Sequence, residues 1–104
     1  MSNKINVIIR GQATVDAPCV FSTIVLKSGI EFKDQITQDN TKYVVKWNYD
    51  LKGQHVDIPA YCIFEFDGGK LSNGSIHWEN TKIFNPYKYE ILDNITESGE
   101  KIEL

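Results

Sequence analysis

Two carboxylates stand close enough in the chain to share a catalytic task. Glu65 and Asp67 are two residues apart, so on a strand both side chains could face the same way. Such a pair supplies the acid and the base that glycosidases and polysaccharide lyases require. The alternation with Phe64 and Phe66 instead puts Glu65 on the solvent side of a strand. Asp67 opens a Gly68-Gly69 turn, where an Asp side chain caps the backbone, so we interpret both carboxylates as structural.

Histidines, cysteines and glycines give no stronger signal for chemistry. His55 and His77 are expected on separate strands without the three or four convergent ligands of a metal site, so we interpret them as surface or edge residues. Cys19 and Cys62 could form a disulfide, but lone cysteines in apolar segments are more often small buried hydrophobes. The Gly68-Gly69 pair could approach a phosphate, but no helix start follows it. The sequence therefore predicts no enzymatic activity, no cofactor and no metal.

Aromatic residues offer either a sugar-stacking surface or a protein interface. Sugars stack on exposed rings, and interfaces use aromatic anchors. Trp47 and Tyr49 fall on the apolar side of a predicted strand, which favours the core or an interface. Tyr61, Tyr87 and Tyr89 are better candidates for exposure. The candidate interface residues are Trp47, Tyr49, Trp78, Tyr87 and Tyr89.

Glycine and asparagine mark the tight turns. Gly68, Gly69 and Gly74 fit positions that need a positive φ or a close backbone approach. Asn73 is expected to stack with its counterparts or to bond its turn. The predicted structural turn residues are Asp67, Gly68, Gly69, Asn73 and Gly74.

Length and composition describe one ordinary globular domain. The chain has 104 residues, of which 41% are hydrophobic and 24% charged, far from the signature of disorder. The formal net charge is -3 and the basic residues are scattered, so nucleic-acid binding is not expected. No segment approaches the roughly 20 apolar residues of a membrane span. The N-terminal apolar run is interrupted too early for a signal-peptide core, so we expect synthesis and assembly in a cytosol.

The elements that must position these residues are short strands. In the segment 41–51, nearly unbroken alternation predicts one long strand with Trp47 and Tyr49 on its buried side. Other short segments rich in β-branched or aromatic residues are separated by turn signals, so we expect an all-β fold. The segment 32–40 is polar and is expected to be a loop or a single turn. The segment 93–104 is expected to be a tail or a hairpin.

The segment 56–83 has the rhythm of a β-solenoid. Very short strands follow one another with turns between them, so each strand could pair with the coil above or below it. A compact sandwich would also produce short strands. Periodicity alone therefore leaves both architectures open.

Four segments of the chain resemble a known structural module. They are 41–53, 56–59, 64–76 (FEFDGGKLSNGSI) and 80–83. The module precedes right-handed parallel β-helices in surface proteins of gut anaerobes and in head or tail fibre proteins of their bacteriophages. The resemblance covers about residues 38–84, and its most specific part is the Gly-Gly-Lys-Leu-Ser-Asn-Gly core. A structural motif implies the fold more firmly than the role.

The resemblance implies a short β-solenoid or β-prism-like module. We expect an N-terminal β-structured anchoring region at 1–40, the solenoid-like module at 41–92 and a tail or hairpin at 93–104. So few coils would leave apolar core open at one end, which identical subunits could close, and a homotrimer is the favoured assembly.

The function implied is that of a virion structural protein. The chain would be a head-fibre, capsid-decorating or appendage subunit of a bacteriophage, assembled in the host cytoplasm together with other capsid or fibre proteins. The alternative is a glycan-binding β-helix module of a bacterial surface protein. Host surface glycan is a further candidate partner.

Overall fold

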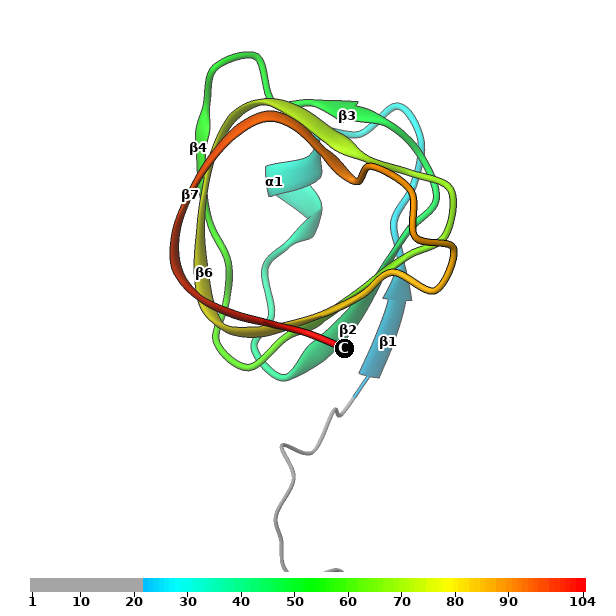
Figure 1. Cartoon of the computed structure of the whole chain (residues 1–104), viewed down its shortest axis with the longest axis vertical. Helices are drawn as coiled ribbons and strands as arrows, with labels where there is room; N and C mark the ends of the chain where they lie inside the picture. Colours follow the sequence, from blue (N-terminus) through cyan, green and yellow to red (C-terminus); the bar gives the residue numbers. More distant parts are fainter. Residues whose placement is uncertain (1–21) are drawn as a thin grey trace, which may run out of the picture.

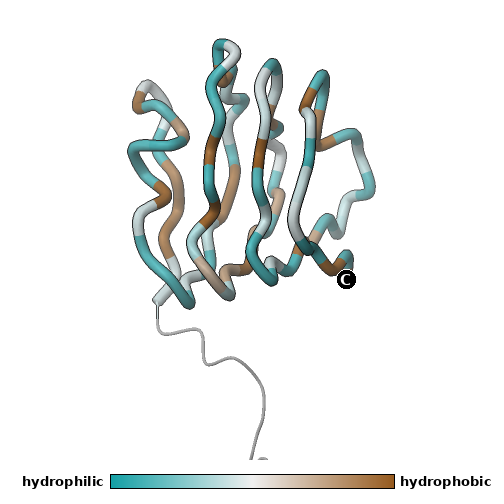
Figure 2. The backbone as a smooth tube through the Cα atoms, turned by 90° about the vertical axis from the view of Figure 1, so that its left-hand side faces the viewer, coloured by the Kyte–Doolittle hydropathy of each residue, from teal (hydrophilic) through white to brown (hydrophobic). Residues whose placement is uncertain are grey.

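A computed structural model describes residues 22–104, which form a β-solenoid of about four turns. Seen along the axis of the coils, the turns superimpose into a rounded outline (Figure 1), and from the side they stand next to one another (Figure 2). The elements are β1 (Ser22–Val25), α1 (Phe32–Gln35), β2 (Thr41–Val45), β3 (Tyr49–Asp50), β4 (His55–Asp57), β5 (Ile63–Phe66), β6 (Leu71–Phe84) and β7 (Leu92–Glu103). The all-β solenoid expected from the sequence is confirmed.

Every strand pairing is parallel, and the pairings build three walls. The first wall runs β1, β2, β5, the end of β6 and the end of β7. The second wall contains β3 and the starts of β6 and β7, and the third contains β4 and the middles of β6 and β7. The long strands β6 and β7 each bend through all three walls. Consecutive coils therefore lie directly on one another.

Apolar side chains stacked in register fill the interior. Tyr43 pairs with Phe64, and Phe64 pairs with Ile83, so the three side chains form one inward column. The Phe64 ring also contacts the Trp78 ring edge-on, with 5.9 Å between the ring centroids. Full burial of one such side chain contributes about 1.5–3 kcal/mol. The first coil is covered by α1, whose Phe32 ring packs against Phe64 and Tyr49.

The corners between walls use left-handed backbone conformations. At one corner, Asn40, Tyr61 and Asn80 have φ values of 53°, 59° and 49°. At a second corner, Asn73 and Asn94 have φ values of 60° and 57°, and the Asn94 Nδ2 donates to Asn73 Oδ1 at 3.0 Å. Asparagine tolerates this backbone region, and the contact is the stacking that the sequence predicted for Asn73.

The structure revises three expectations about the elements. The predicted strand 41–51 is interrupted after β2, because the chain turns a corner there and leaves Trp47 49% exposed. The segment 93–104 is not a tail or a hairpin, because β7 pairs in parallel with β6. The first coil begins at β1, before residue 41. The rest of the expected anchoring region, 1–21, lies outside the described residues.

The single turn expected within 32–40 is present as α1. Cys62 is buried in the core, as the interpretation of a small hydrophobe predicted, while Cys19 lies outside the described residues. Within residues 22–104, no helix is long and apolar enough to cross a membrane.

We predict that position 69 requires glycine, because two coils approach each other closely there. A Cβ at this position would lie 2.6 Å from the Trp47 backbone nitrogen and 2.9 Å from the Lys46 carbonyl carbon. We expect Gly69→Ala to lower the free energy of unfolding by about 1–3 kcal/mol, measured by urea denaturation. Gly53→Asn is the control, because nothing lies within 4 Å of its Cβ position and Asn accepts its φ of 79°. Equal stability of the two variants would contradict the steric explanation.

Candidate functional site

The outer side of the first wall carries apolar side chains in two neighbouring columns, where they alternate with Lys42, Glu65 and Lys82. Because Tyr43, Phe64 and Ile83 point inward, their chain neighbours point outward. We call five outward apolar residues of this wall, together, the apolar face: Val25, Val44, Ile63, Phe84 and Ile102. Val25, Phe84 and Ile102 are exposed by 50%, 39% and 55%, respectively, whereas Val44 is covered by its surroundings. The face extends over all five strand layers of this wall.

Charges beside the apolar face are largely paired within the chain. The Lys42 Nζ lies 2.7 Å from Glu65 Oε1, and the Lys46 Nζ lies 3.5 Å from Asp67 Oδ2. Both pairs join one coil to the next. Glu65 and Asp67 are therefore held by lysines on the wall, and the contact of Asp67 is this ion pair rather than the expected cap of the Gly68-Gly69 turn.

The five candidate interface residues fall into two groups. Tyr49 and Trp78 are buried in the core, where Tyr49 donates its phenol proton to the Lys27 carbonyl. Tyr89 packs against the core, and its hydroxyl accepts from the Gly68 N–H at 2.8 Å and donates to the Gly69 carbonyl at 2.6 Å. Burial raises the pKa of the Tyr89 phenol. These three residues hold the coils together.

Trp47 and Tyr87 are the two candidates that lie on the surface, with exposures of 49% and 68%. Tyr61 is also half exposed, at the corner where it adopts a positive φ. Of the predicted turn residues, Gly68 adopts a φ of 100°. Gly69 and Gly74 lie against the backbone or side chains of the preceding coil.

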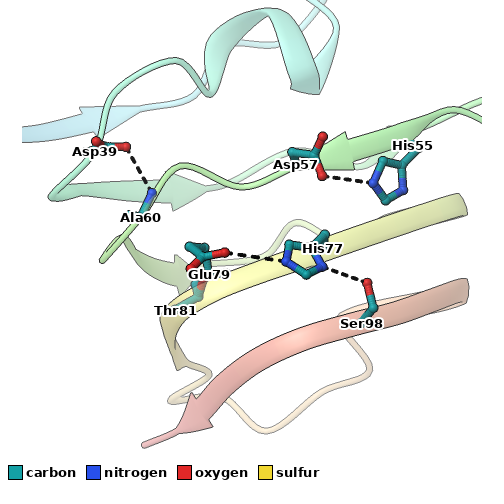
Figure 3. Close-up of polar contacts among 8 residues, drawn as sticks. All are labelled: Asp39, His55, Asp57, Ala60, His77, Glu79, Thr81 and Ser98. Carbon is teal, nitrogen blue, oxygen red and sulfur yellow. Dashed lines mark hydrogen bonds and ion pairs between the residues drawn. The ribbon is translucent and has the colours of Figure 1, made fainter.

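The third wall carries a polar ladder that the sequence analysis missed (Figure 3). The His55 ring contacts Ser75 Oγ through Nδ1 at 2.7 Å and Asp57 Oδ1 through Nε2 at 3.0 Å. The coil below repeats the pattern: His77 contacts Ser98 Oγ at 2.9 Å through Nδ1, and its Nε2 lies 3.4 Å from a Glu79 carboxylate oxygen. The available signal was a His-x-acid triplet at 55–57 and again at 77–79, about one coil apart.

A serine, an imidazole and a carboxylate are the groups of a hydrolytic triad. Hydrolysis would also need donors for the oxyanion and a shaped substrate site. These histidines lie half exposed on a wall of short parallel strands. The geometry therefore supports a ladder of hydrogen bonds that ties neighbouring coils together. Among residues 22–104, no group of three or more His, Cys, Asp and Glu side chains is placed to hold a metal ion.

At two positions the last coil places a charged side chain where the coil before it places an apolar one. Glu97 stacks on Ile76, and Glu103 stacks on Ile83. The Lys101 ammonium pairs with both carboxylates, and Glu97 also accepts the Trp78 indole N–H at 2.9 Å. We call Glu97, Lys101 and Glu103 the charged cap. It covers the core beside Trp78.

The pKa shifts within the charged cap follow from its contacts. Burial alone would raise the pKa of the Glu97 carboxyl, but hydrogen bonds from Lys101 and Trp78 and the Lys101 charge outweigh it, so the pKa lies below its ordinary value. Burial alone would lower the pKa of Lys101, but its contacts with Glu97 and Glu103 raise it. Both groups are therefore held in their charged forms.

Comparison of the chain with protein-family models, with curated proteins and with solved structures found no match.

Glu97→Gln is predicted to lower the free energy of unfolding and to make that free energy depend less on pH in the acid range. A carboxyl with a lowered folded pKa stabilises the protein above its ordinary pKa, and this stabilisation is lost as the pH falls through the folded value. We expect a loss of about 0.5–1 kcal/mol at neutral pH and a smaller change in unfolding free energy from pH 6 to about pH 3. Denaturant titrations across this range measure both. Glu100→Gln, exposed on the same strand, is the control, and an identical pH profile for both variants would disprove the assignment.

Proposed function

We propose that the chain is a structural subunit that forms a homo-oligomer through the apolar face. The supporting observation is the set of outward apolar side chains in two neighbouring columns of the tallest wall, where they alternate with Lys42, Glu65 and Lys82. Monomeric proteins rarely expose contiguous apolar patches of large area, and such patches commonly mark interfaces. A partner on this face would bury Val25, Phe84 and Ile102, which remain exposed to water in the single chain.

A second copy of the same chain is the partner that this face fits best. Sheets pack well face to face because side chains of the two outer surfaces interdigitate. The Lys42–Glu65 pair is already made within one chain, so a copy placed against it need not bring a compensating charge. Lys82 lies between Ile63 and Ile102 in the same column, and its long stem can lie along the apolar surface while its ammonium reaches water.

Association through a wall differs from the closure of an open end. Phe32 covers the core at the first coil, and the charged cap covers it at the last. The ends thus need no sister copy to shield them, whereas the side wall still has exposed apolar area. A trimer remains the proposed assembly, with three first walls facing a common axis.

The biological role that we propose is that of a bacteriophage head-fibre, capsid-decorating or appendage subunit in the virion. This step rests on the resemblance of the 38–84 segment, together with a fold whose coils are bound by hydrogen-bonded walls and stacked side chains. Such a fold suits a rigid, non-enzymatic building block. Docking to another capsid or fibre protein is part of the proposal.

The oligomer is tested by placing charges on the apolar face. We expect the wild-type protein to be an oligomer at micromolar concentration in sedimentation velocity and mass photometry. The double substitution Phe84→Lys and Ile102→Lys should shift it to the monomer while leaving the circular dichroism spectrum unchanged, because both side chains point outward.

Ile30→Lys is the matched control, since Ile30 is 44% exposed and lies outside the apolar face. It should leave the oligomer intact. A wild-type monomer at high micromolar concentration, or an oligomer that survives the double substitution, would overturn the proposed interface.

A further inference from the structure

The corner between the second and third walls contains the only Asn-Gly dipeptide of the chain, Asn73-Gly74. The backbone nitrogen of the following residue can attack the side-chain carbonyl of an asparagine, and a glycine leaves that nitrogen without a shielding side chain. The attack closes a five-membered succinimide ring and releases ammonia. Water then opens the ring at either carbonyl, so an asparagine and a water become an aspartate or isoaspartate and an ammonia.

The fold itself requires this chemically labile pair. Asn73 has a φ of 60°, in the left-handed region that asparagine enters more readily than most residues. A Cβ at position 74 would lie 2.7 Å from the Gln54 carbonyl oxygen and 2.7 Å from the Leu51 Cβ, so only glycine fits against the preceding coil. The tight corner therefore places in succession the two residue types that undergo this reaction most readily.

Hydrogen bonds from both neighbouring coils restrain the reactive groups. On one side, the Gly53 N–H donates to the Asn73 carbonyl at 2.7 Å. On the other side, Asn94 Nδ2 donates to Asn73 Oδ1 at 3.0 Å. Ring closure must turn the Asn73 side chain toward the Gly74 nitrogen and reorient the peptide group between them. Both bonds oppose that movement, so the closed corner protects the asparagine.

The corner is nevertheless accessible to water. Asn73 is exposed, and its corner lies outside the apolar face, so association through that face would leave it uncovered. Local openings of a fold cost less free energy than global unfolding. When opening and closing are fast relative to a chemical step, the rate of that step follows the population of the open form.

We propose that Asn73 is a site of spontaneous deamidation, that its rate is set by opening of this corner, and that the Asn94 amide slows it. The aspartate product keeps the length of the main chain and an acceptor for Asn94. The isoaspartate product adds a methylene group to the main chain ahead of Ile76 and Trp78, which are buried in the core. It therefore disturbs the register on which these inward positions depend.

Mass spectrometry of the full chain, incubated in mildly alkaline buffer and then digested with trypsin, tests the proposal. Asn73 and Asn80 fall in the same tryptic peptide, 71–82. Asn80 is therefore an internal reference, at another corner with a φ of 49°. Fragment spectra should locate the amide-to-acid mass change at Asn73. The native chain should convert at least tenfold more slowly than the chain unfolded in urea.

Asn94→Gly removes the protecting amide, and glycine accepts the φ of 57° at this position. In its native state this variant should deamidate at Asn73 at least threefold faster than the wild type. Asn40→Gly is the matched control, because it makes the same substitution at a φ of 53° in another corner. It should leave the native rate unchanged, and all three chains should react at the same rate in urea.

Three results would overturn the proposal: a native rate equal to the rate in urea, equal native rates for the two glycine variants, or earlier conversion of another asparagine. Absence of conversion at Asn73 in the native Asn94→Gly chain would overturn it as well. The outcome is independent of the proposed oligomer, because neither variant alters a residue of the apolar face.

Discussion

The fold of residues 22–104 depends on the register between parallel coils. Each residue lies over a counterpart about one coil away, so an inward position must be inward in every layer. The column of Tyr43, Phe64 and Ile83 and the asparagine contact at the corners are two results of this single constraint. Even the two exposed histidine clusters follow it, because each histidine reaches the serine of the next coil.

The sequence predicted the architecture better than it predicted individual side chains. Short strands separated by glycine and asparagine indicate an all-β fold and leave a sandwich and a solenoid open, and the resemblance of the 38–84 segment favours the solenoid. Period-2 alternation predicts Trp47 on the buried side of a straight strand, which is wrong because the chain turns at this residue. Tyr49 lies in the core, one of the two places that its side of the strand favours. Trp78 is a candidate interface anchor by residue type alone, which does not distinguish a core ring from a surface ring.

Other features were missed because they join residues that are far apart in the chain. Predicting the histidine clusters requires the number of residues per coil, because that number places His55 beside Ser75 and His77 beside Ser98. The strand character of 93–104 depends on the parallel edge that β6 provides, since its own sequence is polar and favours a hairpin.

The charged cap also limits what can be added to the stack. Parallel coils present a row of unpaired backbone groups, and such an edge can recruit strands from other molecules into fibrils. A strand laid along β7 in the same register would take Glu97, Lys101 and Glu103 out of water, and the desolvation cost of a buried ion pair can exceed its Coulomb attraction. The salt-bridged coil therefore acts as a thermodynamic stop against runaway, amyloid-like elongation.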